Sequence, residues 1–220
     1  ASIPVAFELV TKPIVYSDIE TRKLKRKSEV TKNELMRQMI RICVQNELKF
    51  RFVLTDSWFS SEENFEFITA QGKHFISALK DNRLVAASEE DRIHKRFTRV
   101  DELQIPEHGV VRGWLKGYAK EVLVVRQVFK NKDGSTGTLH LVCSDLTCDY
   151  DAITTTYKRR WEVEVFHKSL KSNASLAKSP TQTTKTQSNH VFMSICAAFK
   201  LECLSLKNKL SPFAMCRKLL

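Results

Sequence analysis

One stripe of a predicted helix over residues 157–171 gathers a carboxylate, three cations and a phenol. The residues are Tyr157, Arg160, Glu164, Lys168 and Lys171. At about 100° per residue, these side chains share a band about 80° wide. The apolar Val163, Phe166 and Leu170 fall on the opposite side, where we expect them to pack into a core. A carboxylate among phosphate-binding cations is the combination that a metal-dependent nuclease needs.

A second carboxylate, Asp56, ends a compact β-prone run over residues 50–55. We expect this run to be a central strand flanked by helices. Sites in α/β sheets form at the carboxyl ends of strands, and two Mg²⁺ ions about 3.5–4 Å apart can cleave a phosphodiester there. Asp56 and Glu164 are therefore the predicted catalytic and metal-binding residues, and Mn²⁺ could substitute. Two alternatives stay open: Asp56 caps the next helix, or Glu164 pairs with Arg160 or Lys168.

Several elements must position these groups. Capping boxes at Thr31/Glu34 and Ser60/Glu63 predict helices that run to about Glu47 and to Gln71 before Gly72. Residues 3–9 and 74–78 are β-prone and read as strands, whereas residues 12–27 read as a basic loop. A polar loop after Lys171 precedes a predicted apolar helix over residues 188–206.

The chain between Asp56 and Glu164 is rich in predicted strands. They cover residues 110–115, 121–129 and 138–144, and a turn signal at residues 131–134 joins the last two. The sequence thus predicts a β-rich segment over residues 84–146. Asp145, which ends the last of these strands, is the rival of Asp56, although we expect it to cap the approach to the next helix.

The spacing Y-(2)-R-(3)-E-(6)-K from Tyr157 to Lys171 is the signature of one group of bacterial insertion-sequence transposases, and the chain resembles the DDE transposase domain of that group. The resemblance implies an RNase H-like α/β fold, a mixed sheet flanked by helices. It would comprise a core over residues 1–83, a β-rich insertion over residues 84–146 and the rest of the core over residues 147–220. The implied function is metal-dependent DNA cleavage and strand transfer.

The resemblance also implies contacts between the protein and DNA. Tyr157, Arg160 and Lys171 would contact DNA beside the cleaved strand, and the helical geometry adds Lys168 to this set. Trp114 would receive a flipped base, as the family uses an aromatic residue in its insertion, or is an ordinary strand aromatic. The partners would be transposon ends and target DNA, bound by a dimer of the full-length protein. Trp58 and Trp161 are expected to be packing residues.

The first aspartate of the family has no counterpart in this sequence. It lies on a strand upstream of the one predicted at residues 3–9, and both Glu8 and Asp18 come too late in the chain. We therefore expect the 220 residues to begin downstream of that aspartate and to be inactive alone. A non-enzymatic DNA-binding remnant of a transposase, and an RNase H-fold nuclease outside transposition, are the alternative functions.

Composition agrees with a nucleic-acid partner. The 36 Lys and Arg residues exceed the 25 Asp and Glu residues, which gives a formal net charge of +11. The six cysteines form no zinc motif, and His140, His167 and His190 show no catalytic spacing. No apolar run of membrane-spanning length is present. We expect a prokaryotic cytoplasmic protein, associated with the nucleoid and not with a membrane.

Overall fold

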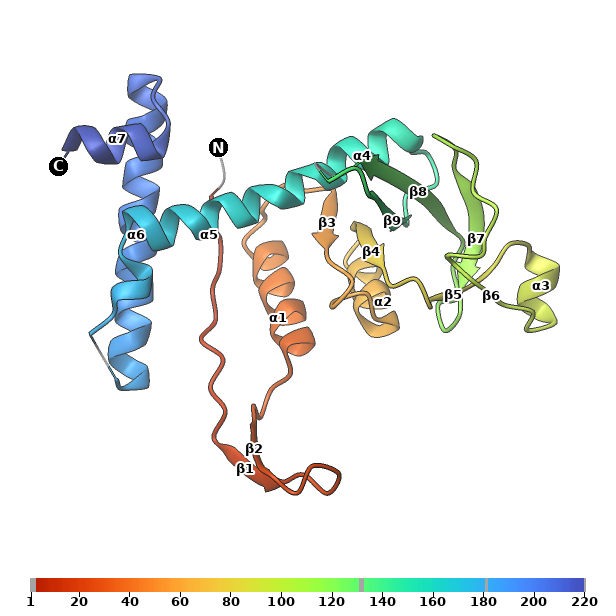
Figure 1. Ribbon diagram of the computed structural model, residues 1–220, viewed down its shortest axis with the longest axis horizontal. Coiled ribbons are helices and arrows are strands. Elements are labelled where there is room, and N and C mark those ends of the chain that lie inside the picture. The colour runs from red at the N-terminus through yellow and green to blue at the C-terminus, as the bar shows by residue number, and fades with distance from the viewer. Residues whose placement is uncertain (1–2, 131–132, 181, 220) are drawn as a thin grey trace. The chain divides into compact units, whose positions relative to one another are not determined.

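The computed structural model describes residues 3–130, 133–180 and 182–219, drawn as a ribbon in Figure 1. The chain divides into two compact units. One consists of residues 36–160, and the other consists of residues 1–35 together with residues 161–220. No helix in the described ranges has both the length and the apolar character needed to cross a bilayer.

The unit of residues 36–160 is built on a mixed sheet of seven described strands in the order β3-β4-β9-β8-β7-β5-β6. The strands are β3 (Phe52–Thr55), β4 (His74–Leu79), β5 (Leu84–Ala86), β6 (Thr98–Arg99), β7 (Val111–Leu115), β8 (Val122–Lys130) and β9 (Thr136–Cys143). β3 and β4 are parallel, and all other neighbours are antiparallel. Strands on both sides of residue 84 therefore share one sheet, because β9 pairs with β4.

Helices cover both faces of this sheet. They are α1 (Lys32–Gln45), α2 (Glu62–Ala70), the short α3 (Glu89–Ile93) and α4 (Tyr150–Lys158), which a 3₁₀ turn, η1 (Arg159–Trp161), follows. Side chains of a strand alternate between faces, so Phe75 of β4 packs in one cluster with α1 and α2, and Ile76 packs in another with α4. Phe65 of α2 stacks on Phe75 with ring centroids 4.0 Å apart. The predicted mixed α/β class is confirmed.

The other unit contains a hairpin and the C-terminal helices. The hairpin pairs β1 (Ile14–Ser17) with β2 (Leu24–Lys27), and the helices are α5 (Glu162–Asn173), the 3₁₀ turn η2 (Leu176–Lys178), α6 (Thr184–Asn208) and α7 (Pro212–Leu219). The loop predicted at residues 12–27 is therefore wrong: Asp18 accepts a hydrogen bond from the Thr21 amide at 2.7 Å and pairs with Lys25 at 2.6 Å, which closes the hairpin turn. The strand predicted at residues 3–9 is also wrong, because that segment is extended but pairs with no strand in the described chain.

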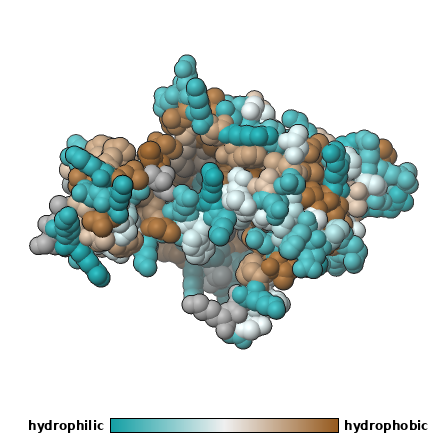
Figure 2. All heavy atoms as spheres, turned by 90° about the horizontal axis from the view of Figure 1, so that it is seen from above, coloured by the Kyte–Doolittle hydropathy of each residue, from teal (hydrophilic) through white to brown (hydrophobic). Residues whose placement is uncertain are grey.

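The C-terminal helices of this unit expose many apolar side chains. The predicted helix over residues 188–206 is confirmed within the longer α6, which buries Ala198 and Leu201. Phe192, Met193 and Leu206 of the same helix are more than half exposed. Hydrophobic residues are accordingly visible on the surface over these helices at the left of Figure 2.

Helix and strand boundaries test the local predictions. The capping box of α1 is confirmed, because Glu34 accepts from the Thr31 amide at 2.7 Å and Thr31 Oγ1 accepts from the Glu34 amide at 3.2 Å. The second box is displaced by one residue, since Ser61, not Ser60, caps α2. The sequence predicts a central place for β3, whereas β3 is an edge strand among the strands that the structure describes. Asn131 and Lys132 of the predicted turn lie outside the described residues.

Candidate active site

Asp56 follows β3 in a strand–helix–strand unit made of β3, α2 and β4. In the parallel pair, Thr55 lies opposite Ser77. The Thr55 hydroxyl donates to Ser77 Oγ at 2.7 Å, and the Ser77 hydroxyl lies 3.4 Å from the Asp56 carbonyl oxygen. These contacts hold the main chain of Asp56 at the carboxyl edge of the sheet, where α/β proteins build their sites.

The Asp56 side chain is exposed and shapes the turn that leaves the strand. Its Oδ1 accepts from the Trp58 amide at 2.9 Å, and its carbonyl accepts from the Phe59 amide at 3.2 Å. Helix α2 begins later and is capped by Ser61, whose hydroxyl accepts from the Asn64 amide at 3.3 Å. Asp56 therefore does not cap α2, and that alternative is wrong.

Tyr157 lies beneath Asp56 and not on the surface. Its side chain is 7% exposed, and its hydroxyl donates to the Thr55 carbonyl oxygen at 3.1 Å. Burial raises the pKa of Tyr157, the charge of Arg160 opposes that rise, and the charge of Asp56 adds to it. The Arg160 guanidinium lies over the Tyr157 ring, 5.7 Å from its centroid. Asp56, Tyr157 and Arg160 thus form one group within the unit of residues 36–160.

The burial of Tyr157 differs from the prediction that this residue contacts DNA directly. A phenol that is inside the sheet–helix core and hydrogen-bonded to the main chain has no face on which a displaced base could stack. In the structure, the Tyr157 hydroxyl joins α4 to the end of β3.

The single regular helix predicted over residues 157–171 is also wrong. α4 ends at Lys158, the turn η1 covers Arg159–Trp161, and α5 begins at Glu162. Residues in a 3₁₀ turn advance by about 120°, not about 100°, so a stripe drawn for one regular helix does not hold across η1. Val163, placed on the apolar side by that drawing, is 48% exposed, whereas Leu170 is buried as predicted.

Helix α5 carries the other predicted residues of the signature. Glu164, Lys168 and Lys171 are all exposed and lie four and then three residues apart, which places them on one face of α5. They belong to the unit that contains residues 161–220. Within that unit the helix offers one carboxylate and two ammonium groups on a single surface.

The three tryptophans differ from one another in their surroundings. Trp114 lies in β7 and is partly buried, with the Arg92 guanidinium 5.6 Å from its ring centroid. Trp58 is 65% exposed and Trp161 is 63% exposed. The prediction that Trp58 and Trp161 pack inside the protein is therefore wrong.

Asp145, the rival of Asp56, has a structural role. It is 3% exposed, forms an ion pair with Arg51, and accepts from the Thr147 hydroxyl at 2.7 Å. Asp149, four residues later, is the residue that caps α4. Neither the pairing of Asp145 with Arg51 nor that of Tyr157 with Thr55 leaves a local signal in the chain, so sequence reasoning missed both.

The described residues include single candidate metal ligands but no complete group of them. Among residues 3–130, 133–180 and 182–219, no three His, Cys, Asp or Glu side chains are grouped as a metal site requires. Asp56 fits one position of such a site, since it is an exposed carboxylate on an ordered strand end and hard cations prefer oxygen ligands.

Comparison with known families decides the identity. The family described as "Transposase DDE domain" matches residues 23–200, which is most of the chain and includes Asp56, Tyr157, Arg160 and Glu164. The chain belongs to the transposase DDE domain family. A comparison with curated proteins gives no match.

Membership of this family indicates which chemistry the residues around Asp56 are compatible with. DDE transposases are nucleases that act on DNA and use divalent metal ions. The seven described strands and their helices agree with the RNase H-like fold of these transposases. The aspartate at the end of β3 and the basic composition of the chain are compatible with such chemistry.

Proposed function

We propose that this chain is the catalytic domain of a transposase that cleaves DNA strands at transposon ends and transfers them to target DNA. The observation that carries the proposal is the group of Asp56, Tyr157 and Arg160. Tyr157 holds the strand end that precedes the Asp56 carboxylate and carries the Arg160 guanidinium over its ring, in a chain of the DDE family. The domain would act on DNA as a dimer of a longer protein in the prokaryotic nucleoid.

Each residue of the signature has a distinct role in this proposal. Asp56 and Glu164 would hold Mg²⁺ or Mn²⁺, and the bound ions would neutralise the phosphate and activate the attacking and leaving oxygens. Arg160 would offer a planar fork to a phosphate, and Lys168 and Lys171 would add positive charge along the DNA backbone. Tyr157 would fix the strand end that carries Asp56.

A third carboxylate would complete the metal site. β3 is hydrogen-bonded to β4 on one side, and its other side has no partner strand among the described residues. We infer that a strand bearing the family's first aspartate pairs with this edge of β3, which would place its carboxylate beside Asp56. We also propose that residues 84–146 are an insertion between the two parts of the RNase H-like core, residues 1–83 and 147–220.

Iron-mediated cleavage of the protein chain tests the two carboxylates without requiring activity on DNA. When hydrogen peroxide and ascorbate are added, Fe²⁺ bound in place of Mg²⁺ reduces the peroxide to hydroxide and a hydroxyl radical, ascorbate regenerates Fe²⁺, and the radicals cut the backbone near the metal ligands. We expect cuts near both Asp56 and Glu164. Either Asp56→Asn or Glu164→Gln should reduce the cuts near both residues, because each variant removes a ligand of the same metal site. Asp133→Asn and Glu162→Gln, which change exposed carboxylates of the same two units, serve as matched controls. Cuts near only one of the two residues would exclude a shared site.

Two other functions make different predictions. A DNA-binding remnant of a transposase would bind DNA but show no metal-dependent cuts at Asp56 and Glu164. An RNase H-fold nuclease outside transposition would show the cuts and would cleave branched DNA without joining transposon ends to a target. The family match favours a transposase, active or decayed, over a nuclease outside transposition.

A further inference from the structure

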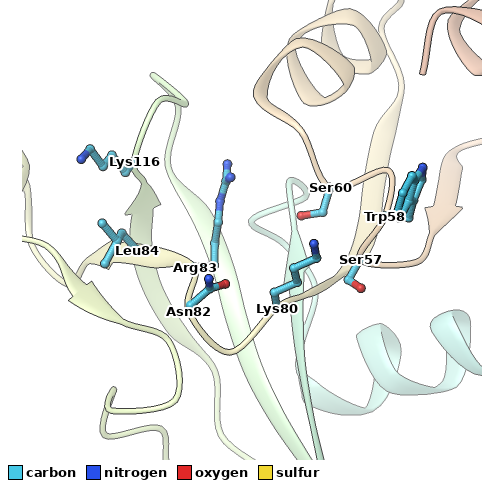
Figure 3. A pocket seen from close by; sticks show the side chains of 8 residues that line it. All are labelled: Ser57, Trp58, Ser60, Lys80, Asn82, Arg83, Leu84 and Lys116. Carbon is cyan, nitrogen blue, oxygen red and sulfur yellow. The ribbon is translucent and has the colours of Figure 1, made fainter. Parts of the chain in front are cut away.

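A polar hollow of about 410 Å³ opens beside Ser57 and Trp58, which directly follow Asp56, in the unit of residues 36–160. Its lining includes three cations, two hydroxyl groups and an indole, which Figure 3 shows from close by. These residues are Ser57, Trp58, Ser60, Lys80, Arg83 and Lys116. We call this hollow the Arg83 pocket.

The sheet topology explains why these side chains meet. β3 and β4 are parallel, so Ser57 and Trp58 after β3 lie at the same edge as Lys80 after β4. The chain then turns, with the Arg83 amide donating to the Lys80 carbonyl at 2.9 Å. Lys116 follows β7, and its amide donates to the Leu84 carbonyl at 2.9 Å. The pocket therefore sits on the edge that carries Asp56.

Arg83 has unmet hydrogen-bonding capacity in this pocket. Its Nε and Nη2 atoms are shielded from solvent and have no hydrogen-bond partner among the described residues. Burial lowers the pKa of Arg83, and the Glu62 carboxylate partly offsets this effect. Buried donors without acceptors cost about 1–3 kcal/mol each, and more on charged groups, so such an arrangement favours an anionic ligand.

The charge and shape of the pocket select the kind of anion. Lys80, Arg83 and Lys116 contribute three positive charges, and Glu62, whose carboxylate lies close to Gly117, contributes one negative charge nearby. In Figure 3, Arg83 lies between Lys116 on one side and Lys80 with Ser60 on the other. A guanidinium fork flanked by ammonium and hydroxyl groups suits a phosphate better than a single carboxylate.

Trp58 points to a polynucleotide rather than to a small phosphate. Its indole is 65% exposed where it lines the pocket. Exposed aromatic side chains beside a cationic groove are platforms on which bases of a single strand stack, whatever their sequence. A phosphate held by Arg83 and a neighbouring base against Trp58 would together fit one segment of nucleic-acid strand.

We propose that the Arg83 pocket binds a backbone phosphate of the DNA strand next to the bond that reacts at Asp56, with Trp58 against an adjacent base. This proposal rests on the proposed function, because it takes Asp56 as part of the cleavage site. It adds a phosphate-binding site made by Lys80, Arg83 and Lys116, outside the Tyr157–Lys171 signature.

Salt-dependent DNA binding without divalent metal tests the proposal. Labelled single-stranded DNA is titrated with the 220-residue protein in EDTA over a series of salt concentrations, and fluorescence anisotropy is recorded. Arg83→Gln and Lys116→Gln should each weaken binding and reduce the slope of log affinity against log salt by about 0.7, the value for one phosphate contact on a single strand. Arg83→Lys, which keeps the charge but loses the fork, should weaken binding while leaving the slope nearly unchanged. Trp58→Ala should weaken binding by about fivefold or more, without changing the slope.

Lys130→Gln is the matched control, since it removes one exposed charge of the same unit outside the pocket. The proposal is overturned if the pocket variants bind DNA like this control. Lys116 is exposed, so its variant keeps the test valid if Arg83→Gln fails to fold. Asp56→Asn should bind DNA normally in EDTA. The absence of iron-mediated cuts near Asp56 in the parent protein would thus refute the metal site alone, and unchanged binding by Arg83→Gln would refute the pocket alone.

Discussion

The Tyr157 hydroxyl donates a hydrogen bond to the Thr55 carbonyl oxygen, 3.1 Å away and 102 residues earlier in the chain. This bond ties α4 to the last residue of β3, directly before Asp56. A tyrosine of the Y-(2)-R-(3)-E-(6)-K spacing therefore supports the carboxylate through the main chain. Its ring also carries the Arg160 guanidinium, so one buried side chain positions both a candidate metal ligand and a candidate phosphate ligand.

Tyr157→Phe should destabilise the protein by about 1–2 kcal/mol, because the buried Thr55 carbonyl loses a donor. Urea unfolding followed by circular dichroism measures this change. Tyr150→Phe, on the same helix, is the matched control, since the Tyr150 hydroxyl has no hydrogen bond among the described residues.

The same variant separates a positioning role from direct DNA contact. In EDTA, Tyr157→Phe should bind DNA with the affinity and salt slope of the parent protein, because a buried hydroxyl does not touch the backbone. With metal present, iron-mediated cuts near Asp56 should shift or weaken. A large loss of DNA affinity in EDTA would instead indicate that Tyr157 contacts DNA directly.

Local sequence signals predicted the carboxyl end of β3 well. A compact β-prone run followed by Asp, and the capping box of Thr31 and Glu34, depend on residues that are neighbours in the chain. The environment of Tyr157 could not be found in this way, because a helical projection shows which residues share a face but not what lies against that face. Thr55, its partner, comes from a strand far away in the sequence.

The N-terminal residues show the same limit for strands. Residues 3–9 have strong β propensity but no partner strand in the described chain, whereas the basic residues 24–27 form a strand because residues 14–17 lie opposite them. β propensity describes how a residue fits a paired, half-buried surface, and pairing decides whether the surface exists. The Arg83 pocket was missed for a related reason. The parallel pairing of β3 and β4 brings Lys80 and Arg83 near the residues that follow Asp56, and the pairing of β5 with β7 adds Lys116.

Asp145→Asn should destabilise the protein by about 1–3 kcal/mol at neutral pH, since the charge-assisted bond from Arg51 is removed while the amide oxygen still accepts from Thr147. Thermal unfolding measures the difference. Asp133→Asn is the control: Asp133 also accepts from a neighbouring hydroxyl, that of Ser135, but is exposed.

Acid should remove the contribution of Asp145. Burial acts to raise the pKa of Asp145, but hydrogen bonds from Thr147, the charge of His74 and the Arg51 hydrogen bond together hold it below its ordinary value. A carboxylate with a lowered folded-state pKa stabilises the protein above the ordinary pKa of about 4, and the effect fades as pH falls through the folded-state pKa. The stability difference between the parent protein and Asp145→Asn should therefore shrink below about pH 4. A difference that stays constant there would contradict the ion pair.

Arg160 and Lys171 should both contribute to DNA binding. Replacing the two by Ala should weaken binding in EDTA and reduce the salt slope by about 2, because two backbone phosphates are no longer neutralised by the protein. Arg126→Ala together with Lys130→Ala removes the same charge from β8 and should have a smaller effect. If the two double variants behave alike, binding reflects total charge and not the signature.

Cleavage of transposon-end DNA is the strictest test of Glu164. We expect the 220-residue chain to leave such DNA uncut in Mg²⁺ or Mn²⁺, because the proposed ligands Asp56 and Glu164 would supply only two of the three carboxylates of the proposed site. A polypeptide that also carries the family's first aspartate, on a strand able to pair with the open edge of β3, should cleave the DNA. In that polypeptide Glu164→Gln removes a charge at nearly constant shape and should abolish cleavage. We expect the cleavage rate to fall by about 10³-fold or more, which corresponds to an activation free energy higher by about 4 kcal/mol.

Binding measured on the same variants shows which step is impaired. Glu164→Gln should keep its affinity for DNA in EDTA, because a carboxylate does not attract the backbone, whereas Arg160→Ala should lose affinity and cleavage together. Glu162→Gln, two residues away on α5, should cleave like the parent polypeptide and so controls for the helix itself. Cleavage by the 220-residue chain would mean that another carboxylate completes the site. Asp18, which is held by Lys25 and Thr21, and Asp145, which is held by Arg51, would then be replaced in turn to find it.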